Sequence, residues 1–198
     1  MNYKKYFKEF FQNEAERQAS KLVSPDCIQK FYARLKSKTA CFTGHRAQKL
    51  PWGFNEKDER CKAMKANLKA EIEKAIACGY NRFICGMALG FDMICAETLL
   101  KLKKKHEIYL EGAIPCKNQE SKWSKEYKAR YKKLLKKLNT VYYVSEEYTG
   151  VECMLERNRY MVDNSSLIIA LFNGNDGGTK YTVDYARQQG LKIVLIEP

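Results

Sequence analysis

From residue 39 onward, short apolar runs alternate with longer amphipathic segments, and this alternation constrains the fold more than any other feature of the chain. The apolar runs have the length of buried strands, and the segments between them repeat apolar residues at helical spacing. Strands are expected at residues 39–43, 82–85, 107–114, 141–144, 167–172 and 192–196. Helices are expected at residues 57–78, 92–105, 123–138, 151–162 and 180–189. The alternation predicts an α/β fold with an open parallel sheet of about six strands and helices on both faces.

Residues 1–37 follow a different pattern, with many aromatic and charged residues and apolar residues at helical spacing. Pro25 and Asp26 are typical of a helix start after a break. We therefore expect an N-terminal helical extension at 1–37 and a main domain at 38–198. A chain of 198 residues that is 45% hydrophobic can bury one substantial core.

The sequence lacks the patterns typical of a membrane span, a secretory signal or a metal site. No apolar run approaches the roughly 20 residues that span a bilayer, and the N-terminus has no apolar stretch of a secretory signal. These observations predict a cytoplasmic protein without a membrane partner. The eight cysteines form no C-x-x-C pair, and the two histidines lie far apart in the sequence. We expect buried thiols in a reducing compartment and no structural metal.

The formal net charge of +13 is concentrated in one stretch. Residues 101–137 hold thirteen lysines and arginines against four glutamates. One interpretation is a solvated helix face, and the other is a binding surface for nucleic acid or a polyanionic small ligand. Charge alone does not separate the two.

Three glycine-marked turns each follow an expected strand and precede an expected helix. We call them the first turn (43–46), the second turn (86–92) and the third turn (177–179). Because the carboxyl ends of parallel strands meet at one edge of a sheet, the three turns are expected to lie near each other. Glycine lets the backbone approach an anion, and the following helix offers free N–H groups. The candidate ligand residues are Thr43, Gly44, His45, Arg46, Gly86, Met87, Ala88, Gly90, Asp92, Gly177, Gly178 and Thr179.

Several charged or polar side chains near these turns have two interpretations each. His45 either contacts the ligand or fixes the hydrogen bonds of its loop, whereas Arg46 is suited to gripping a phosphate in a bidentate way. Asp92 is either the N-cap of its helix or a partner for a ribose hydroxyl or a polar base edge. Arg157 lies at the border of a buried helix face and needs an anionic partner, which is an internal carboxylate or a ligand.

Together these residues resemble the SLOG superfamily of Rossmann-like nucleotide-binding proteins and, within it, the YpsA family. The resemblance covers about residues 39–198. Its marks are the first and second turns, Pro115 with Gln119 and Trp123 at four-residue steps, and the segment from Arg157 to the third turn. The resemblance implies a Rossmann-like fold and adds Gln119 and Trp123 as candidate ligand residues, with Trp123 either stacking on a base or packing in the core.

Two relatives in this superfamily have different functions, and the chain is similar to each in part. The LOG-type phosphoribohydrolases carry an Arg-Lys-x-x-Met helix and an acidic pair after a glycine-rich turn. Arg157 and Met161 are similar to the first part, but Lys180, Tyr181 and Thr182 stand where the acidic pair would be. The DNA-processing protein DprA has a Ser-Gly-x-Ala-x-Gly-Ile-Asp run that is similar to residues 85–92.

The leading hypothesis is a binder or sensor of a nucleotide or ADP-ribose-like ligand. The three turns would hold phosphates, Arg46 and Arg157 would neutralise them, Asp92 would hold a sugar hydroxyl, and Trp123 would stack on a base. The expected partner is thus a phosphorylated small molecule, and a second copy of the chain is a further expected partner.

Two alternatives belong to other classes of function. One is an N-glycosidic or phosphoester hydrolase that uses His45 or Asp184 as base and Arg157 as electrostatic stabiliser. The other is a DprA-like binder of nucleic acid that acts through residues 101–137.

Overall fold

The computed structural model of the protein describes residues 24–198. An α/β unit spans Lys36–Pro198, and the chain before it belongs to a separate unit. Helix α3 (Pro25–Ser37) begins at the expected proline. The remainder of the predicted N-terminal extension lies outside the described residues.

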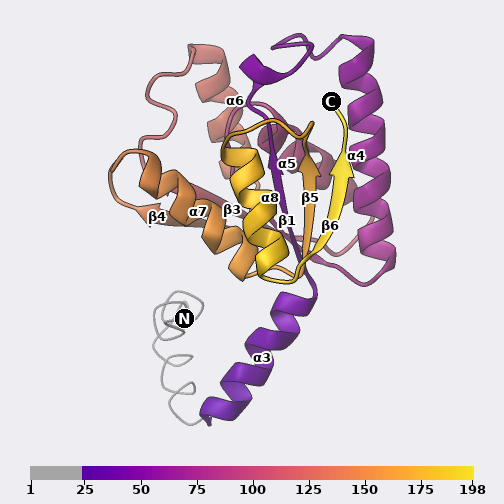
Figure 1. The fold of residues 1–198 in the computed structure, drawn as a ribbon, viewed down its shortest axis with the longest axis vertical. Helices are drawn as coiled ribbons and strands as arrows, with labels where there is room; N and C mark the ends of the chain where they lie inside the picture. Colours follow the sequence, from indigo (N-terminus) through magenta and orange to yellow (C-terminus); the bar gives the residue numbers. More distant parts are fainter. Residues whose placement is uncertain (1–23) are drawn as a thin grey trace. The chain divides into compact units, whose positions relative to one another are not determined.

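The α/β unit is built on six parallel strands in the order β4-β3-β2-β1-β5-β6 (Figure 1). The strands are β1 (Thr39–Gly44), β2 (Arg82–Cys85), β3 (Tyr109–Cys116), β4 (Thr140–Ser145), β5 (Leu167–Leu171) and β6 (Lys192–Ile196). The predicted parallel sheet of about six strands is confirmed. β3 begins two residues later than predicted, because its pairing with β2 starts where Tyr109 meets Arg82.

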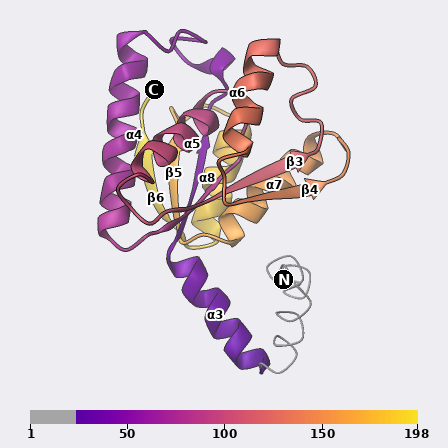
Figure 2. The same cartoon turned by 180° about the vertical axis from the view of Figure 1, so that it is seen from behind.

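Helices cover both faces of this sheet, as predicted. They are α4 (Glu59–Ala77), α5 (Phe91–Leu102), α6 (Lys125–Leu135), α7 (Val151–Asp163) and α8 (Gly178–Gln188), with a short 3-10 helix η1 (Ala47–Lys49) after β1. Figure 1 shows α7 and α8 in front of the sheet, and Figure 2 shows α4, α5 and α6 covering the opposite face. α6 begins later than predicted because Ser124 caps it, its side chain accepting a hydrogen bond from Tyr127 N.

Alternate residues of the central strands supply two apolar cores. Phe42 and Phe83 belong to the larger core beneath α4, α5 and α6, whereas Cys41 and Ile84 belong to a smaller core beneath α7 and α8. Burial on both faces explains why these strands are continuously apolar in the sequence.

All eight cysteines are free, and six are buried as expected. Cys27 and Cys78 are exposed, because α3 buries no residue and Cys78 ends α4. Burial raises the pKa of the Cys41 thiol to about 12, so this thiol stays protonated at neutral pH. Within residues 24–198 no helix is both long and apolar enough to cross a membrane. Across that same range, no three histidine, cysteine or acidic side chains gather as metal ligands would.

The strand order reverses at β1, which lies between β2 and β5. Gly44 at the end of β1 pairs in register with Leu171 at the end of β5. In open α/β sheets a crevice forms outside the carboxyl ends of the strands at such a reversal. The loops that follow β1 and β5 are therefore the expected position of a ligand site.

Candidate functional site

The first turn meets the loop after β5, which leads to the third turn, through a side-chain contact at the strand reversal. His45 is buried, and its Nε2 lies 2.9 Å from Oδ1 of Asn173, the second residue after β5. The same oxygen accepts a hydrogen bond from Asn175 N at 3.2 Å. Because this atom accepts from a backbone N–H, it is the amide oxygen, and His45 must donate to it from Nε2. His45 therefore fixes hydrogen bonds between the loops, and its contact with a ligand stays a prediction.

The second turn rests on a buried ion pair between Asp92 and Arg157. Arg157 Nη1 lies 3.7 Å from Asp92 Oδ2 and donates to the carbonyl of Gly86. Asp92 Oδ2 also accepts from Ala88 N at 3.2 Å. Burial raises the pKa of Asp92 against the opposing charge of Arg157, and burial lowers the pKa of Arg157. The anionic partner that the sequence demanded for Arg157 is therefore an internal carboxylate.

Asp92 is not the N-cap of its helix. Gly90 occupies that position with φ +101°, and Asp92 is the second residue of α5. The carboxylate turns back toward the loop instead, where it accepts from Ala88. The N-cap prediction for Asp92 is wrong because the free conformation of glycine lets the helix start one residue earlier than the carboxylate.

A chain of hydrogen bonds connects the second turn to the start of α8. Arg157 Nε donates to Asn158 Oδ1 at 2.9 Å, and Asn158 Nδ2 donates to Thr182 Oγ1 at 2.9 Å. Thr182 Oγ1 in turn donates to Gly178 O at 2.7 Å. The second and third turns are thus tied to each other through α7.

A pocket of about 400 Å³ opens beside the second turn. Its lining residues are Arg46, Gln48, Phe54, Ala88, Leu89, Gln119, Lys122, Trp123, Ser124, Tyr127 and Met154. The lining includes two cations and three aromatic rings and no carboxylate. Arg46 makes a 3.4 Å contact with Met154 Sδ and, among the described residues, no ion pair. An unpaired cation beside aromatic rings is an environment suited to an anionic ligand with a flat ring.

Gln119 and Trp123, two of the predicted ligand residues, line the pocket and both contact Tyr131. Gln119 Nε2 donates to Met87 O and to Tyr131 Oη, both at 3.1 Å. Trp123 packs edge-on against Tyr131 with 5.2 Å between ring centroids. Trp123 is half-buried against the larger core and also lines the pocket, so its packing role is confirmed and its stacking on a base stays a prediction.

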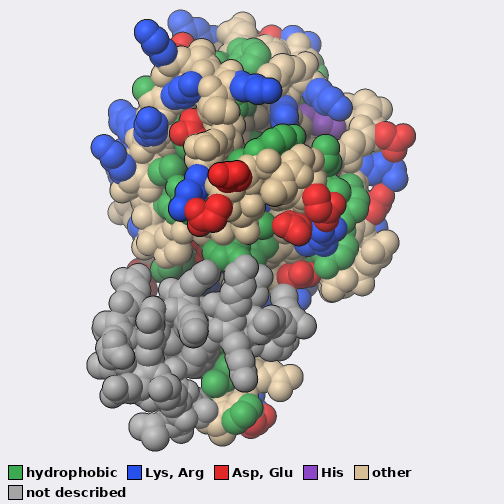
Figure 3. Space-filling view, turned by 90° about the vertical axis from the view of Figure 1, so that its left-hand side faces the viewer, with side chains coloured by type: hydrophobic (Ala, Val, Ile, Leu, Met, Phe, Trp, Pro, Cys, Tyr) green, Lys and Arg blue, Asp and Glu red, His purple; other side chains and the backbone are tan. Residues whose placement is uncertain are grey.

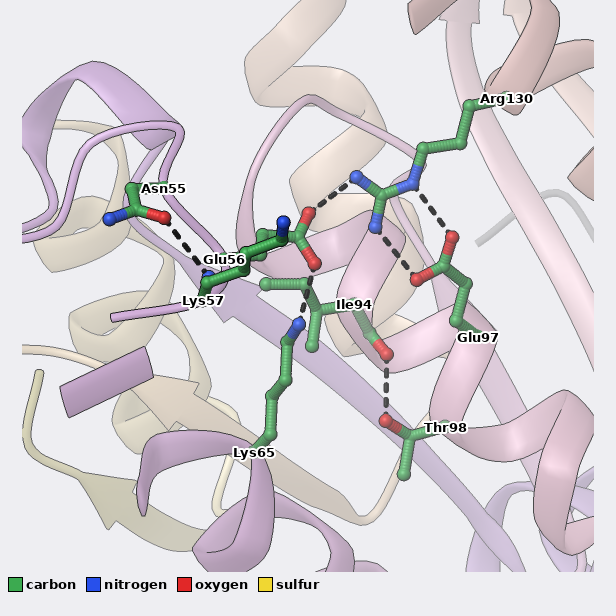
Figure 4. Close-up of polar contacts among 8 residues, drawn as sticks. All are labelled: Asn55, Glu56, Lys57, Lys65, Ile94, Glu97, Thr98 and Arg130. Atoms are coloured by element: carbon green, nitrogen blue, oxygen red, sulfur yellow. Dashed lines mark hydrogen bonds and ion pairs between the residues drawn. The ribbon is translucent and has the colours of Figure 1, made fainter. Parts of the chain in front are cut away.

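An ion-pair cluster, which Figure 4 shows, links α4, α5 and α6 to the loop that carries Phe54. Arg130 of α6 grips Glu97 of α5 with two hydrogen bonds of 2.7 Å and also donates to Glu56. Lys65 of α4 donates to the other oxygen of Glu56 at 2.6 Å. Glu56 belongs to the loop that carries Phe54, whose ring lies 5.4 Å from that of Tyr127. The cluster therefore fixes two of the pocket's aromatic rings.

The structure separates the predicted site residues into three groups. Arg46, Ala88, Gln119 and Trp123 line the pocket. A second group lies beneath or beside it without lining it: Thr43, Gly44, His45, Gly86, Met87, Gly90, Asp92 and Arg157. The third turn, with Gly177, Gly178 and Thr179, also lies outside the pocket lining, and the loop that leads to it contacts the first turn through Asn173.

Sequence reasoning missed Phe54, Lys122 and Tyr127 as pocket residues. Lys122 and Tyr127 flank Trp123 in the loop and helix that follow β3, so proximity to a carboxyl-edge loop was a usable signal for them. Phe54 had no such signal, because a long-range contact with α6 brings its loop to the pocket.

The two residues considered as catalytic bases lie outside the pocket. Asp184 is ion-paired with Lys180 and Arg187, both at 2.8 Å, and hydrogen bonding with Lys180 holds its pKa below the ordinary value. His45 has its Nε2 engaged by Asn173. Neither arrangement supports a base that acts on a ligand in the pocket.

The basic stretch at residues 101–137 does not form one surface. Lys122 lines the pocket, whereas the lysines at the ends of α5 and α6 lie at the amino edge of the sheet. Asn139 marks that edge, since its Oδ1 accepts from Lys103 Nζ at 2.6 Å and from Leu110 N at 2.9 Å. Figure 3 shows lysine and arginine side chains over the upper part of one face of the α/β unit, with most acidic side chains lower down.

The fold and this site define a Rossmann-like α/β protein with a cationic and aromatic pocket at the carboxyl edge of its sheet. The family model described as the YspA SLOG family (YpsA) matches residues 40–197, and the chain belongs to this family. The match confirms the resemblance predicted from the glycine turns.

Two bacterial relatives agree with this assignment. The SPbeta prophage-derived protein YoqJ of Bacillus subtilis is 36% identical over 138 residues, which cover 63% of this chain and 81% of YoqJ. A UPF0398 protein of Brevibacillus brevis is 30% identical over 144 residues, covering 70% of this chain and 75% of that protein.

Solved structures with the same fold include two DNA processing proteins A (DprA). The protein from Streptococcus pneumoniae superposes with a TM-score of 0.56 at 14% identity over 81% of this chain, which spans about half (50%) of the DprA chain. The Helicobacter pylori protein superposes with a TM-score of 0.57 at 14% identity, over 83% of this chain and 67% of its own. At this identity the likeness is one of fold.

Proposed function

We propose that the protein binds a nucleotide or an ADP-ribose-like phosphorylated ligand at the carboxyl edge of its sheet. One observation carries the proposal: the pocket combines Arg46 and Lys122 with three aromatic rings, and its lining contains no carboxylate. A nucleotide offers the matching pair of features, a flat base and an anionic phosphate.

Different residues of the pocket suit the base and the phosphate of a nucleotide. Trp123, Tyr127 and Phe54 supply stacking faces, and stacking of a base on an aromatic ring is worth about 1–3 kcal/mol. Arg46 and Lys122 attract the phosphate. The second turn adds Ala88 and Leu89 to the pocket lining, and α5 begins after Gly90 without a side-chain cap, where the backbone of residues 45–47 packs closely.

The third turn is suited to a further phosphate. α8 also begins without a side-chain cap, after Gly177. Lys49 Nζ lies 3.6 Å from the position that a Cβ would take on Gly177, which brings a cation to the same helix start. A ligand with two phosphates, such as ADP-ribose, would extend from the pocket past the first turn to this point.

The roles of Asp92 and Arg157 change in this proposal. Both side chains are buried and face each other, so they support the floor of the second turn and do not contact the phosphate. Arg46 is then the arginine that neutralises the ligand.

Thermal-shift titration with AMP, ADP, NAD, ADP-ribose and cyclic nucleotides tests the proposal. A ligand at 100 times its dissociation constant stabilises the native state by about 2.7 kcal/mol. We expect at least one ligand to raise the melting temperature, and we expect Arg46→Gln and Trp123→Leu to abolish that rise. Arg187→Gln, an exposed arginine outside the pocket, is the matched control and should respond like the unaltered protein. If no member of the panel shifts the transition, the proposal is wrong.

The second candidate ligand is single-stranded DNA, of which one nucleotide would occupy the pocket. The observation that favours it is the shared fold with the H. pylori DprA, whose structure describes single-stranded DNA binding. The same rings and cations would hold one nucleotide of such a strand, and its binding would weaken steeply with salt.

Anisotropy titrations with a labelled oligonucleotide separate the two possible DNA surfaces. Arg46→Gln and Trp123→Leu should weaken binding through the pocket, whereas neutralising Lys132, Lys133, Lys136 and Lys137 should leave it unchanged. The opposite pattern would show that DNA binds to the lysines at and just after the end of α6, and the absence of binding to any oligonucleotide would rule out this candidate.

A further inference from the structure

The orientation of the Gln119 side-chain amide is fixed by its two partners. Nε2 lies 3.1 Å from the backbone carbonyl of Met87 and 3.1 Å from the hydroxyl of Tyr131. A backbone carbonyl can only accept, so the atom facing Met87 must be the nitrogen. The usual ambiguity between the two ends of an amide is therefore absent at Gln119.

Both partners are buried. Tyr131 and Met87 are 1% and 0% exposed. Met87 has φ +56° and is the one non-glycine residue with a positive φ among the described residues. Such a conformation persists where the surrounding packing determines it, here with Met87 Cγ beside Gly112, on which a Cβ would lie only 3.3 Å away. The Met87 carbonyl is thus held toward Gln119.

The amide oxygen is the end that this arrangement leaves for a ligand. Gln119 lines the pocket, and its Oε1 has no hydrogen-bond partner within the described part of the chain. A half-buried acceptor without a donor costs free energy unless a ligand or water supplies one. Trp123, whose ring packs edge-on against Tyr131, lines the same pocket as Gln119.

We propose that Gln119 selects ligands whose base carries an exocyclic amino group, as adenine and cytosine do. This inference rests on the proposed nucleotide site and names the class of base that it accepts. The amino group donates one N–H to Gln119 Oε1 while the ring stacks on Trp123. Since both Nε2 hydrogens are engaged, Gln119 cannot turn its donor toward a base carbonyl without losing its contact with Met87 or Tyr131.

Other base edges are poorly matched to this acceptor. Hypoxanthine places a carbonyl where adenine has its amino group, so two acceptors would face each other. A ring imide, as in uracil, has carbonyls on both sides of its N–H, and the neighbouring Ala88 and Leu89 side chains offer no donors to them. Sites that hydrogen-bond a ligand group discriminate strongly against analogues without it, because the protein group is then left unpaired.

Isothermal titration with three purine nucleotides tests the inference on the unaltered protein. AMP, purine riboside 5′-monophosphate and IMP share ring size, sugar and phosphate and differ at the position of the amino group. We expect AMP to bind about tenfold or more tighter than either analogue. Equal affinities would overturn the inference and leave the proposed nucleotide site standing. If none of the three binds, and CMP and UMP do not bind either, both the inference and the nucleotide site fall.

Two variants then assign the selectivity to Gln119. Gln119→Met keeps the length of the side chain and removes the acceptor, so the AMP preference should fall to within about twofold while affinity for purine riboside 5′-monophosphate is retained. Tyr131→Phe is the matched control, because the Met87 carbonyl still orients the amide, and it should keep the preference. A preference that survives in Gln119→Met would assign the selectivity to another group.

Discussion

The second and third turns look alike in the sequence, and the structure makes them opposites. A Cβ on Gly86 would lie 2.1 Å from Arg157 Nη1, and one on Gly90 would lie 2.7 Å from Ala47 N. A Cβ on Gly178 would meet nothing within 4 Å. The glycines of the second turn are required by the protein's own packing, whereas Gly178 stands at an open helix start.

The difference teaches that a glycine turn has two distinct physical causes. Packing glycines allow buried groups to approach the backbone, here the guanidinium of Arg157 below the second turn. An open glycine leaves room above the first helical N–H groups, which is useful only if something occupies that room. The two causes make different predictions for stability and for binding.

The largest expected effect comes from breaking the ion pair beneath the second turn. Asp92→Ala leaves Arg157 buried without a counter-charge and should lower the free energy of unfolding by about 3–5 kcal/mol. Urea denaturation measures this loss. Combining Asp92→Ala with Arg157→Met should recover much of it, because no charge is then stranded. A loss that is equally large in the double variant would show that the pair itself is not the cause.

A methyl group on the second turn should have the next largest effect. Gly86→Ala forces the Arg157 guanidinium away from the Gly86 carbonyl and should cost about 1–3 kcal/mol through overpacking. Chemical denaturation of Gly86→Ala beside the unaltered protein gives the value. Stability unchanged by the methyl group would mean that Arg157 moves freely, contrary to its buried position.

The helices after the two turns should also respond oppositely to acid. Burial raises the pKa of Asp92 above the value of about 3.9 that an unfolded Asp has. Between these two pKa values the native state binds a proton that the unfolded state has lost. Lowering the pH through this range therefore favours the native state. Hydrogen bonding with Lys180 lowers the pKa of Asp184, so its contribution is present above the unfolded value and is lost as the pH falls.

Unfolding midpoints measured between pH 3 and 7 distinguish the opposite pH dependences expected for Asp92 and Asp184. Asp92→Asn should make stability fall more steeply on acidification than in the unaltered protein. Asp184→Asn should make it fall less steeply, by a small amount because this carboxylate is exposed. If the slope of stability against pH changes in the same direction in both variants, the two carboxylates do not respond oppositely to acid.

The smallest effect on stability is expected at the open glycine. Gly178→Ala meets no neighbour and sits at a helix start, so the free energy of unfolding should change by no more than about 0.5 kcal/mol. Affinity for a ligand with two phosphates should nevertheless fall, and affinity for AMP should fall less. Unfolding curves and titration with ADP-ribose and AMP test both halves. Unaltered ADP-ribose affinity would remove the third turn from the proposed site.

The fold could be predicted from the sequence because buried parallel strands are continuously apolar and the helices between them keep a 3.6-residue period. The site could be predicted only in part. Residues in the turns were found because they follow strands directly, but Phe54 reaches the pocket through the contacts of Arg130 with Glu56, which lie 74 residues apart. The sequence showed that Arg157 needs an anionic partner, and only the fold identifies Asp92, 65 positions earlier in the sequence.

The pairing of β1 with β5 has a consequence for how the chain reaches this structure. β1 ends at Gly44 and its second neighbour begins at Leu167, so the centre of the sheet cannot close until most of the domain has been synthesised. Pairings of such long sequence separation form slowly and leave apolar strand edges uncovered in the meantime. The His45 contact with Asn173 joins the same two segments, so the loops at the strand reversal come together only when β1 and β5 pair.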